Sequence, residues 1–155
     1  MKIFENNIKP DEKLIENLKL SFNEKKYTKA EKLALTLISK FPEYQWGWKI
    51  LGEIFRVNGN HNESLRAIKK AVEINNFDYE ALYNLGVIQF ELKKFNDAEA
   101  SFLNCISIKE DLAEAYYNLA NSQVKLGKHS LAEKNFEISI SIKPSLTSSY
   151  FNLGN

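Results

Sequence analysis

Apolar side chains recur along this chain at intervals of three and four residues, which is the spacing of one face of an α-helix. Between residues 80 and 92 the pattern consists of Ala81, Leu82, Leu85, Ile88 and Leu92. A break follows near Lys93 and Lys94, and a second helical pattern then begins. The sequence therefore predicts pairs of short helices, each pair joined by a tight turn.

This pattern repeats at a fixed interval, with clear copies that begin at Gln45, Tyr79, Ala113 and Thr147 and a weaker copy that begins at Asp11. The eighth place of the four clear copies holds a small residue: Gly52, Gly86, Ala120 and Gly154. A period of this length is typical of solenoids in which stacked units share one continuous core. We expect an all-α chain that folds as a superhelical solenoid of antiparallel helix hairpins.

The repeats predict a single array over residues 11–155 that follows an N-terminal extension of residues 1–10. Its units are 11–44, 45–78, 79–112 and 113–146, with a partial unit at 147–155. We expect the two helices of a unit to cross closely at the small residues, with Phe102 and Phe136 buried around the crossing. Asn17 and Leu18 depart from the pattern and predict that the first helix of the first unit is rotated or shifted.

The ends of the second helix in each unit are also marked in the sequence. Gly59 and Gly127 suit the turn before it, because glycine adopts positive φ at little cost. The eighteenth place holds the N-cap candidates Thr28, Asn62, Asn96 and Ser130. Glutamates three residues later complete a capping box in three of the four units: Glu31, Glu99 and Glu133. Pro42 and Pro144 are expected to end the second helix.

The whole pattern from about Asp11 to Asn155 resembles the tetratricopeptide repeat (TPR) family. The resemblance rests on the 34-residue period and on Tyr116, Leu119, Ala120, Ala132, Phe136 and Pro144. It departs from the family at Gln89 and Gln123, which stand where an aromatic residue is usual. The resemblance implies a right-handed superhelix whose first helices line a concave surface, and a function in binding other proteins.

Composition supports a soluble folded chain of 155 residues, with 44% hydrophobic and 26% charged residues. The net charge of +1 gives no indication of nucleic-acid binding, and no apolar run approaches the ~20 residues of a membrane helix. The N-terminus lacks the apolar segment of a signal peptide. A single cysteine excludes a disulfide framework within the chain and fits a reducing compartment, so we expect a cytoplasmic location.

The sequence offers few candidates for catalytic chemistry. His61 and His129 are separated by two full periods, and they occupy a place that is aromatic in the other units. This favours a packing role over catalysis or metal binding, because metal ligands must converge. Cys105 occupies a place that holds small residues in other units, so we expect a buried side chain rather than a reactive thiol. We therefore expect a protein that is not an enzyme and has no cofactor or metal.

The first helices supply the candidates for a binding surface. These are Lys49, Arg56, Tyr83, Asn84, Val87, Phe90, Tyr117, Asn118, Asn121, Phe151 and Asn152. Asparagine recurs in one place and could form a ladder, since an amide both donates to and accepts from any peptide backbone. Aromatic side chains beside it would add apolar contact area. Alternatively, the asparagines bond to neighbouring helices and the tyrosines are buried between units.

We expect an interaction scaffold that binds an extended peptide segment in its concave groove. Lys49 and Arg56 at one end, and Glu80 and Glu114 further along, would give this groove a charge polarity. The asparagine ladder resembles that of the superhelical arm of the O-linked N-acetylglucosamine transferase. Similar arrays precede glycosyl-, sulfo- and methyltransferase domains, so the alternative is an N-terminal recruiting arm of a larger transferase.

Two other binding modes fit the sequence poorly. The carboxylate clamp of co-chaperone TPR domains needs asparagine and lysine where this chain has Glu53 and Glu114. RNA-reading pentatricopeptide repeats have a longer unit and usually a basic face. Because the last unit is incomplete, its apolar residues Tyr150 and Leu153 lead us to expect self-association through the C-terminal end.

Overall fold

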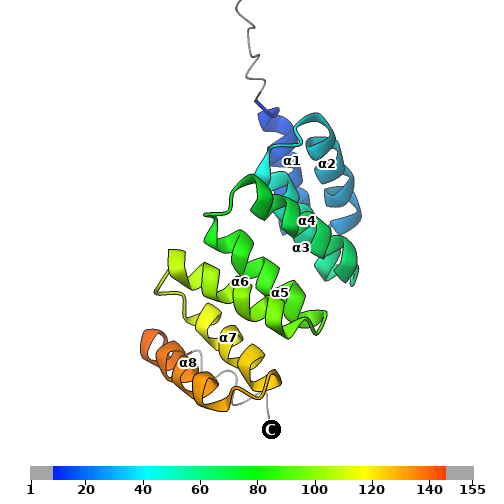
Figure 1. Cartoon of the computed structure of the whole chain (residues 1–155). Coiled ribbons are helices and arrows are strands. Elements are labelled where there is room, and N and C mark those ends of the chain that lie inside the picture. The colour runs from blue at the N-terminus through cyan, green and yellow to red at the C-terminus, as the bar shows by residue number, and fades with distance from the viewer. Residues whose placement is uncertain (1–8, 146–155) are drawn as a thin grey trace, which may run out of the picture.

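The computed structural model describes residues 9–145, and in this range the chain is helical apart from its turns and contains no strand (Figure 1). The described helices are α1 (Glu12–Asn23), α2 (Tyr27–Lys40), α3 (Gln45–Val57), α4 (His61–Ile74), α5 (Tyr79–Glu91), α6 (Phe95–Ile108), α7 (Ala113–Lys125) and α8 (His129–Ile142). This confirms the prediction of an all-α fold.

The helices pack as hairpins that stack in chain order. Each helix contacts the next one along the chain, and α5 also contacts α7. The first helices α5 and α7 therefore lie side by side, and the hairpins follow one another along a superhelix (Figure 1). Pro42 and Pro144 each lie two residues after the last residue of a second helix, as expected.

Within a hairpin, a glycine lets the two helices approach closely. A Cβ atom added to Gly86 would lie 2.6–2.8 Å from three ring atoms of Phe102. At Gly52, an added Cβ would overlap the side chain of Ile68, and the Gly52 carbonyl accepts a hydrogen bond of 2.8 Å from Ser64 Oγ. Phe102 is fully buried. The large side chain thus occupies the space that the absent glycine side chain leaves.

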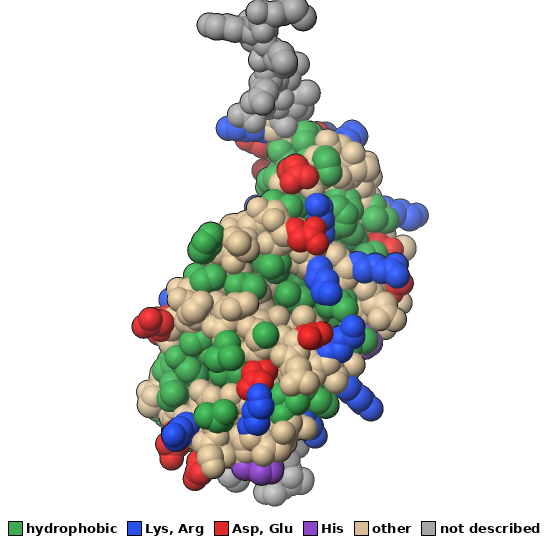
Figure 2. Space-filling model, viewed as in Figure 1, with side chains coloured by type: hydrophobic (Ala, Val, Ile, Leu, Met, Phe, Trp, Pro, Cys, Tyr) green, Lys and Arg blue, Asp and Glu red, His purple; other side chains and the backbone are tan. Residues whose placement is uncertain are grey.

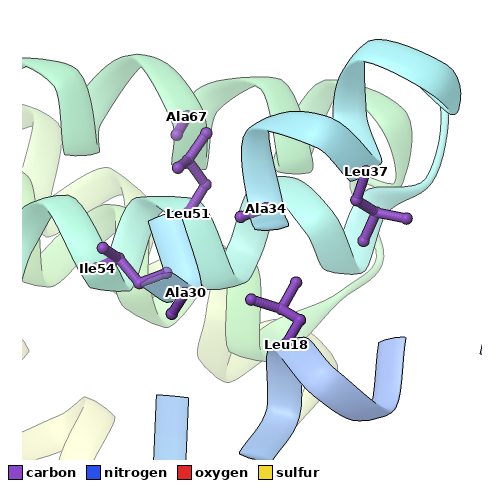
Figure 3. Packing of buried hydrophobic residues seen from close by; sticks show 7 residues of the cluster. All are labelled: Leu18, Ala30, Ala34, Leu37, Leu51, Ile54 and Ala67. Atoms are coloured by element: carbon purple, nitrogen blue, oxygen red, sulfur yellow. The ribbon is translucent and has the colours of Figure 1, made fainter. Parts of the chain in front are cut away.

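The first hairpin reaches the same fit with the sizes reversed. Leu18 stands where later units have glycine or alanine, and Ala34 stands where they have Ile68 or Phe102. Both Leu18 and Ala34 are fully buried in one cluster with Leu37 (Figure 3). The prediction that α1 is rotated or shifted is therefore wrong, because the eighth place still points into the core and only the size of its side chain differs.

Phe136 departs from the prediction that it is buried, since it is only half-buried. Its ring packs edge-on against Tyr117, with ring centroids 5.5 Å apart. The equivalent Phe102 belongs to α6, which packs against both α5 and α7, whereas α8 packs chiefly against α7 among the described helices. Burial of this place therefore depends on a helix on each side.

The turns inside the hairpins also correct the predicted helix starts. Gly59 and Gly127 have φ of 77° and 74°, as the glycine prediction requires, and Lys25 and Lys93 adopt similar values of 57° and 60°. After each such residue, a backbone N–H bonds back to the first helix, as in the 2.8 Å bond from Lys94 N to Gln89 O. This closed turn starts the second helix immediately afterwards.

As a result, the predicted N-caps are wrong. The cap positions are Lys26, Asn60, Lys94 and Lys128, and none of these side chains makes a capping hydrogen bond. Thr28, Asn62, Asn96 and Ser130 instead lie at the second residue of their helices, so the capping boxes do not form. The place that is aromatic in two units begins each second helix, and Tyr27 and Phe95 pack there on Phe22 and Phe90, with ring centroids 5.9 and 5.3 Å apart, whereas His129 is exposed.

Candidate functional site

A cavity of about 700 Å³ opens along the layer of first helices, and we call it the groove cavity. It is lined by Phe22, Trp46, Lys49, Ile50, Glu53, Arg56, Tyr83, Asn84, Val87, Phe90, Glu91, Phe102 and Asn118. These residues come from α1, α3, α5 and α7, with only Phe102 contributed by a second helix. The groove cavity therefore spans four successive hairpins.

Most of the predicted surface residues line this cavity. They are Lys49, Arg56, Tyr83, Asn84, Val87, Phe90 and Asn118. Tyr117 and Asn121 do not line it, and Phe151 and Asn152 lie outside the described residues.

Sequence reasoning missed Phe22, Ile50 and Glu91 as lining residues. The period could have identified Phe22 and Ile50, because they occupy the places of Phe90 and Asn84 in other units. Glu91 directly follows the predicted residue Phe90, but its place in the repeat was not expected to face the groove.

The floor of the groove cavity is apolar. Tyr83, Val87 and Phe90 are half-buried and pack against the cluster that contains the fully buried Phe102. The rings of Tyr83 and Phe102 lie 5.9 Å apart between centroids. Because this floor is held by core packing, its shape is formed before any ligand binds, and the exposed parts of its side chains offer apolar contact area.

The two asparagines that line the cavity differ in their bonding. Asn118 Nδ2 donates a 3.0 Å hydrogen bond to Tyr83 Oη, which ties α7 to α5. This is the kind of bond to a neighbouring helix that the alternative interpretation of the asparagines expected. The Asn84 amide is half-buried and has no hydrogen-bond partner among the described residues. Asn84 is thus the amide whose hydrogen-bonding groups remain available to a ligand.

Lys49 is held by two carboxylates of the next hairpin. Its Nζ lies 2.9 Å from Asp78 Oδ2 and 2.6 Å from Glu80 Oε2, and its side chain is only 16% exposed. Burial opposes the charge, but the hydrogen bonds to Glu80 and Asp78 outweigh it and raise the pKa of Lys49. Asp78 also caps α5, because its Oδ1 accepts from the backbone N–H groups of Glu80 and Ala81.

Arg56 is held in the same way from two sides. Its guanidinium donates two hydrogen bonds, of 3.0 and 2.7 Å, to Glu53 and one of 3.1 Å to Glu91. These bonds, chiefly those to Glu53, raise the pKa of Arg56 further above its ordinary value despite its burial. The second carboxylate oxygen of Glu91 lies 3.3 Å from His61 Nδ1. The cation of Arg56 is therefore fixed in a network of its own chain.

These ion pairs overturn the expected charge polarity of the groove. Lys49 bonds directly to Glu80, and Glu114 bonds to Lys143 at 2.9 Å, so positive and negative groups do not separate toward opposite ends. The reason is that long side chains in this stack reach carboxylates about one repeat away in sequence. Figure 2 shows the result on one face, where acidic and basic side chains lie next to each other between apolar ones.

Cys105 confirms its prediction, because its side chain is fully buried and its Sγ lies 3.2 Å from the Tyr79 carbonyl oxygen. Burial, with a smaller effect of the Asp78 charge, raises the pKa of its thiol to about 11. Over residues 9–145, histidine, cysteine and acidic side chains form no group of three or more that could hold a metal ion. Within the same range, every helix is too short or too polar to cross a membrane.

Comparison with known proteins identifies two of the repeats and the fold. A family model for the tetratricopeptide repeat matches residues 79–112 and 113–146. No curated protein matches the chain. The crystal structure of MamA is similar with 24% identity and a TM-score of 0.79, covering 88% of this chain and 77% of that one.

Two further solved structures share the fold. YrrB, described as a TPR protein with an unusual peptide-binding site, has 17% identity and a TM-score of 0.81, with 92% of this chain and 73% of that chain covered. MamA from Desulfovibrio magneticus RS-1 has 14% identity and a TM-score of 0.78, with coverages of 85% and 75%. Residues 79–146 therefore form two tetratricopeptide repeats, and the described helices share the superhelical fold of these solved structures.

Proposed function

We propose that this chain is a non-catalytic interaction scaffold that binds an extended peptide segment of another protein in the groove cavity. The observation that carries the proposal is the combination of a preformed apolar floor with the available amide of Asn84. An extended peptide needs both, since its apolar side chains gain from contact with an apolar surface and its backbone N–H and C=O groups need hydrogen-bond partners. The cavity extends over four hairpins, which suits a long ligand better than a compact one.

The proposal assigns separate roles to the lining residues. Asn84 would bond to the peptide backbone, whereas Val87, Phe90 and Ile50 would contact its side chains. Asn118 would bond to the peptide backbone more weakly than Asn84, because its amide nitrogen already donates to Tyr83 Oη. Tyr117, Asn121, Phe151 and Asn152 remain predicted contacts for the part of a ligand that extends beyond the cavity.

A displayed library of random peptides of about twelve residues, selected on the full chain, would test the proposal. We expect enriched peptides that lose about fivefold in affinity with Asn84→Ala, as one backbone hydrogen bond contributes about 1 kcal/mol. Asn62→Ala is the matched control, because Asn62 is an exposed asparagine on α4 that does not line the cavity. Val87→Glu, which places a charge on the floor, should abolish binding.

Thermal melts of all variants would show that the fold is retained. Failure to enrich any peptide would contradict the proposal. Enriched peptides that bind Asn84→Ala and Val87→Glu as tightly as the parent chain would also contradict it, because they would bind elsewhere.

We also propose that two copies associate through their α8 ends. Leu131, Ile138 and Ile140 of α8 are 48%, 38% and 41% exposed, and Tyr150 and Leu153, which lie outside the described residues, were predicted to take part. In a head-to-tail stack, α8 of one copy would pack on α1 of the next, as α2 packs on α3. This arrangement is disfavoured, because α3 makes its close contact with Ile38 through Gly47, whereas α1 has Lys13 in the equivalent place. Sedimentation should give a closed dimer that Ile138→Glu converts to monomer; a monomeric parent chain at high concentration would refute it.

A further inference from the structure

We infer that the peptide segment bound in the groove cavity is basic, with lysine or arginine side chains placed between apolar ones. This inference rests on the proposed function and adds the chemistry of the partner. The charged groups around the cavity provide the reason, because their number and pairing favour a cationic ligand and oppose an acidic one.

The ion-pair networks at the groove cavity contain more carboxylates than cations. Lys49 is bound by Asp78 and Glu80, and Arg56 is bound by Glu53 and Glu91. Four carboxylates thus surround two cations, which leaves an excess of two negative charges in a chain whose formal net charge is +1. Glu53 and Glu91 line the cavity itself, whereas the excess comes from Asp78 and Glu80, which bind Lys49 beside it.

Neighbouring charges do not cancel this excess. On α1, Glu16 and Lys19 occupy places equivalent to Asn84 and Val87, and their opposite charges balance each other. At the other end, Glu114 is paired with Lys143. A cationic segment would therefore enter a region of favourable potential and an acidic one would be repelled.

The two cations cannot easily serve an acidic ligand. Lys49 is 16% exposed and already bonds to two carboxylates, and Arg56 makes three hydrogen bonds to Glu53 and Glu91. An incoming carboxylate would have to displace an existing partner and leave that partner's charge unpaired. In contrast, Glu80 is 58% exposed and its Oε1 accepts no hydrogen bond from the described residues, so it can accept one from a ligand cation.

Aromatic rings in the cavity add a second kind of site for a cation. One ring is already occupied, because Lys19 Nζ lies 5.7 Å from the centroid of the Trp46 ring. The rings left for a ligand cation are those of Phe22 and Phe90, which line the same cavity. Ring faces attract lysine and arginine side chains, whose aliphatic stems also contact the apolar floor.

Three pools of labelled peptides, about twelve residues long, would test the inference on the full chain. All pools carry mixed Leu, Ile, Val and Phe at alternating positions, and the remaining positions hold Lys and Arg, Asp and Glu, or Ser and Gln. The variant Glu80→Gln/Glu91→Gln removes one carboxylate from the Lys49 network and one from the Arg56 network. Glu73→Gln is the control, because Glu73 is a 66% exposed glutamate on α4 that belongs to neither network and pairs with Lys70 instead.

We expect the basic pool to bind more tightly than the other two and to weaken as salt is raised. The double variant should lower its affinity at least about threefold, as loss of two exposed charge pairs does, whereas Glu73→Gln should bind as the parent chain does. If the double variant has a much lower melting temperature than the parent chain, the affinity of Glu80→Gln alone is measured instead, since the Glu80 side chain is largely exposed.

The outcomes separate this inference from the proposed function. Tighter or equal binding of the acidic or uncharged pool, with sensitivity to Val87→Glu, would overturn the inference and leave the peptide-binding groove intact. Binding of the basic pool that Glu73→Gln weakens as much as the groove variants would overturn the inference too. Absence of binding by all three pools would overturn both.

Discussion

Substitution of Gly86 by alanine changes the closest contact between two helices of a hairpin. The new Cβ would lie 2.6, 2.7 and 2.8 Å from three ring atoms of Phe102, which is closer than side-chain carbons approach one another. Phe102 is fully buried and sits between α5 and α7, so its ring has little room to retreat. We expect overpacking to cost about 1–3 kcal/mol.

Alanine also has a better helix propensity than glycine, by about 1 kcal/mol. The net loss of unfolding free energy for Gly86→Ala should therefore be about 0–2 kcal/mol. Phe102→Leu, which shortens the ring side chain, should cost about 1–2 kcal/mol through lost burial and an imperfect fit. If the two changes were independent, the double variant would lose the sum of these values.

The geometry instead predicts strong coupling between the two positions. In Gly86→Ala/Phe102→Leu the added methyl group occupies part of the volume that the ring vacated, so the double variant should recover about 1–2 kcal/mol relative to additivity. The first hairpin supports this expectation, because Leu18 and Ala34 show that the sizes at these two places can be exchanged.

Urea unfolding followed by circular dichroism, with midpoints and slopes compared across the cycle, would measure the coupling. Gly52→Ala combined with Phe102→Leu is the control, since these two positions belong to different hairpins and should be additive. Additive free energies for the Gly86 and Phe102 pair would refute the reasoning that their sizes are matched.

Three further results are expected. Asp78→Asn keeps the cap of α5 but removes a charge, so it should cost on the order of 1 kcal/mol at pH 7. Burial opposes the charge of Asp78, but hydrogen bonds from Lys49 and the Ala81 N–H outweigh it and hold the pKa of Asp78 low. The Asp78 carboxylate therefore adds to the free energy of unfolding above its unfolded pKa, and this addition is lost as pH falls through the folded pKa. An equal loss of stability for Asp78→Asn at pH 7 and at pH 2 would contradict this. Lys93→Gly should raise the melting temperature slightly because φ is 60°, whereas Lys94→Gly, with φ of −87°, should lower it. Cys105, buried and with a pKa of about 11, should react with a disulfide reagent only after unfolding.

The repeat itself determines most of the fold and part of the groove. Apolar spacing and the recurring small residues depend only on neighbours three or four positions apart and on one fixed period. They therefore predicted the helix hairpins, the crossing at Gly86 and the burial of Phe102 and Cys105. The same period brought seven predicted side chains together in the groove cavity, because equivalent places of first helices share one face of the stack.

The tertiary structure decided the polar features. Helix starts follow from turns closed by backbone bonds around residues such as Lys93, which no side-chain pattern at Asn96 revealed. Asn84 and Asn118 are equivalent in sequence, yet only Asn118 has a tyrosine hydroxyl within reach. Likewise, Lys49 meets Glu80 from the next hairpin. Long polar side chains bond to groups that lie about one repeat away in sequence, so their partners depend on how the hairpins stack and not on the period alone.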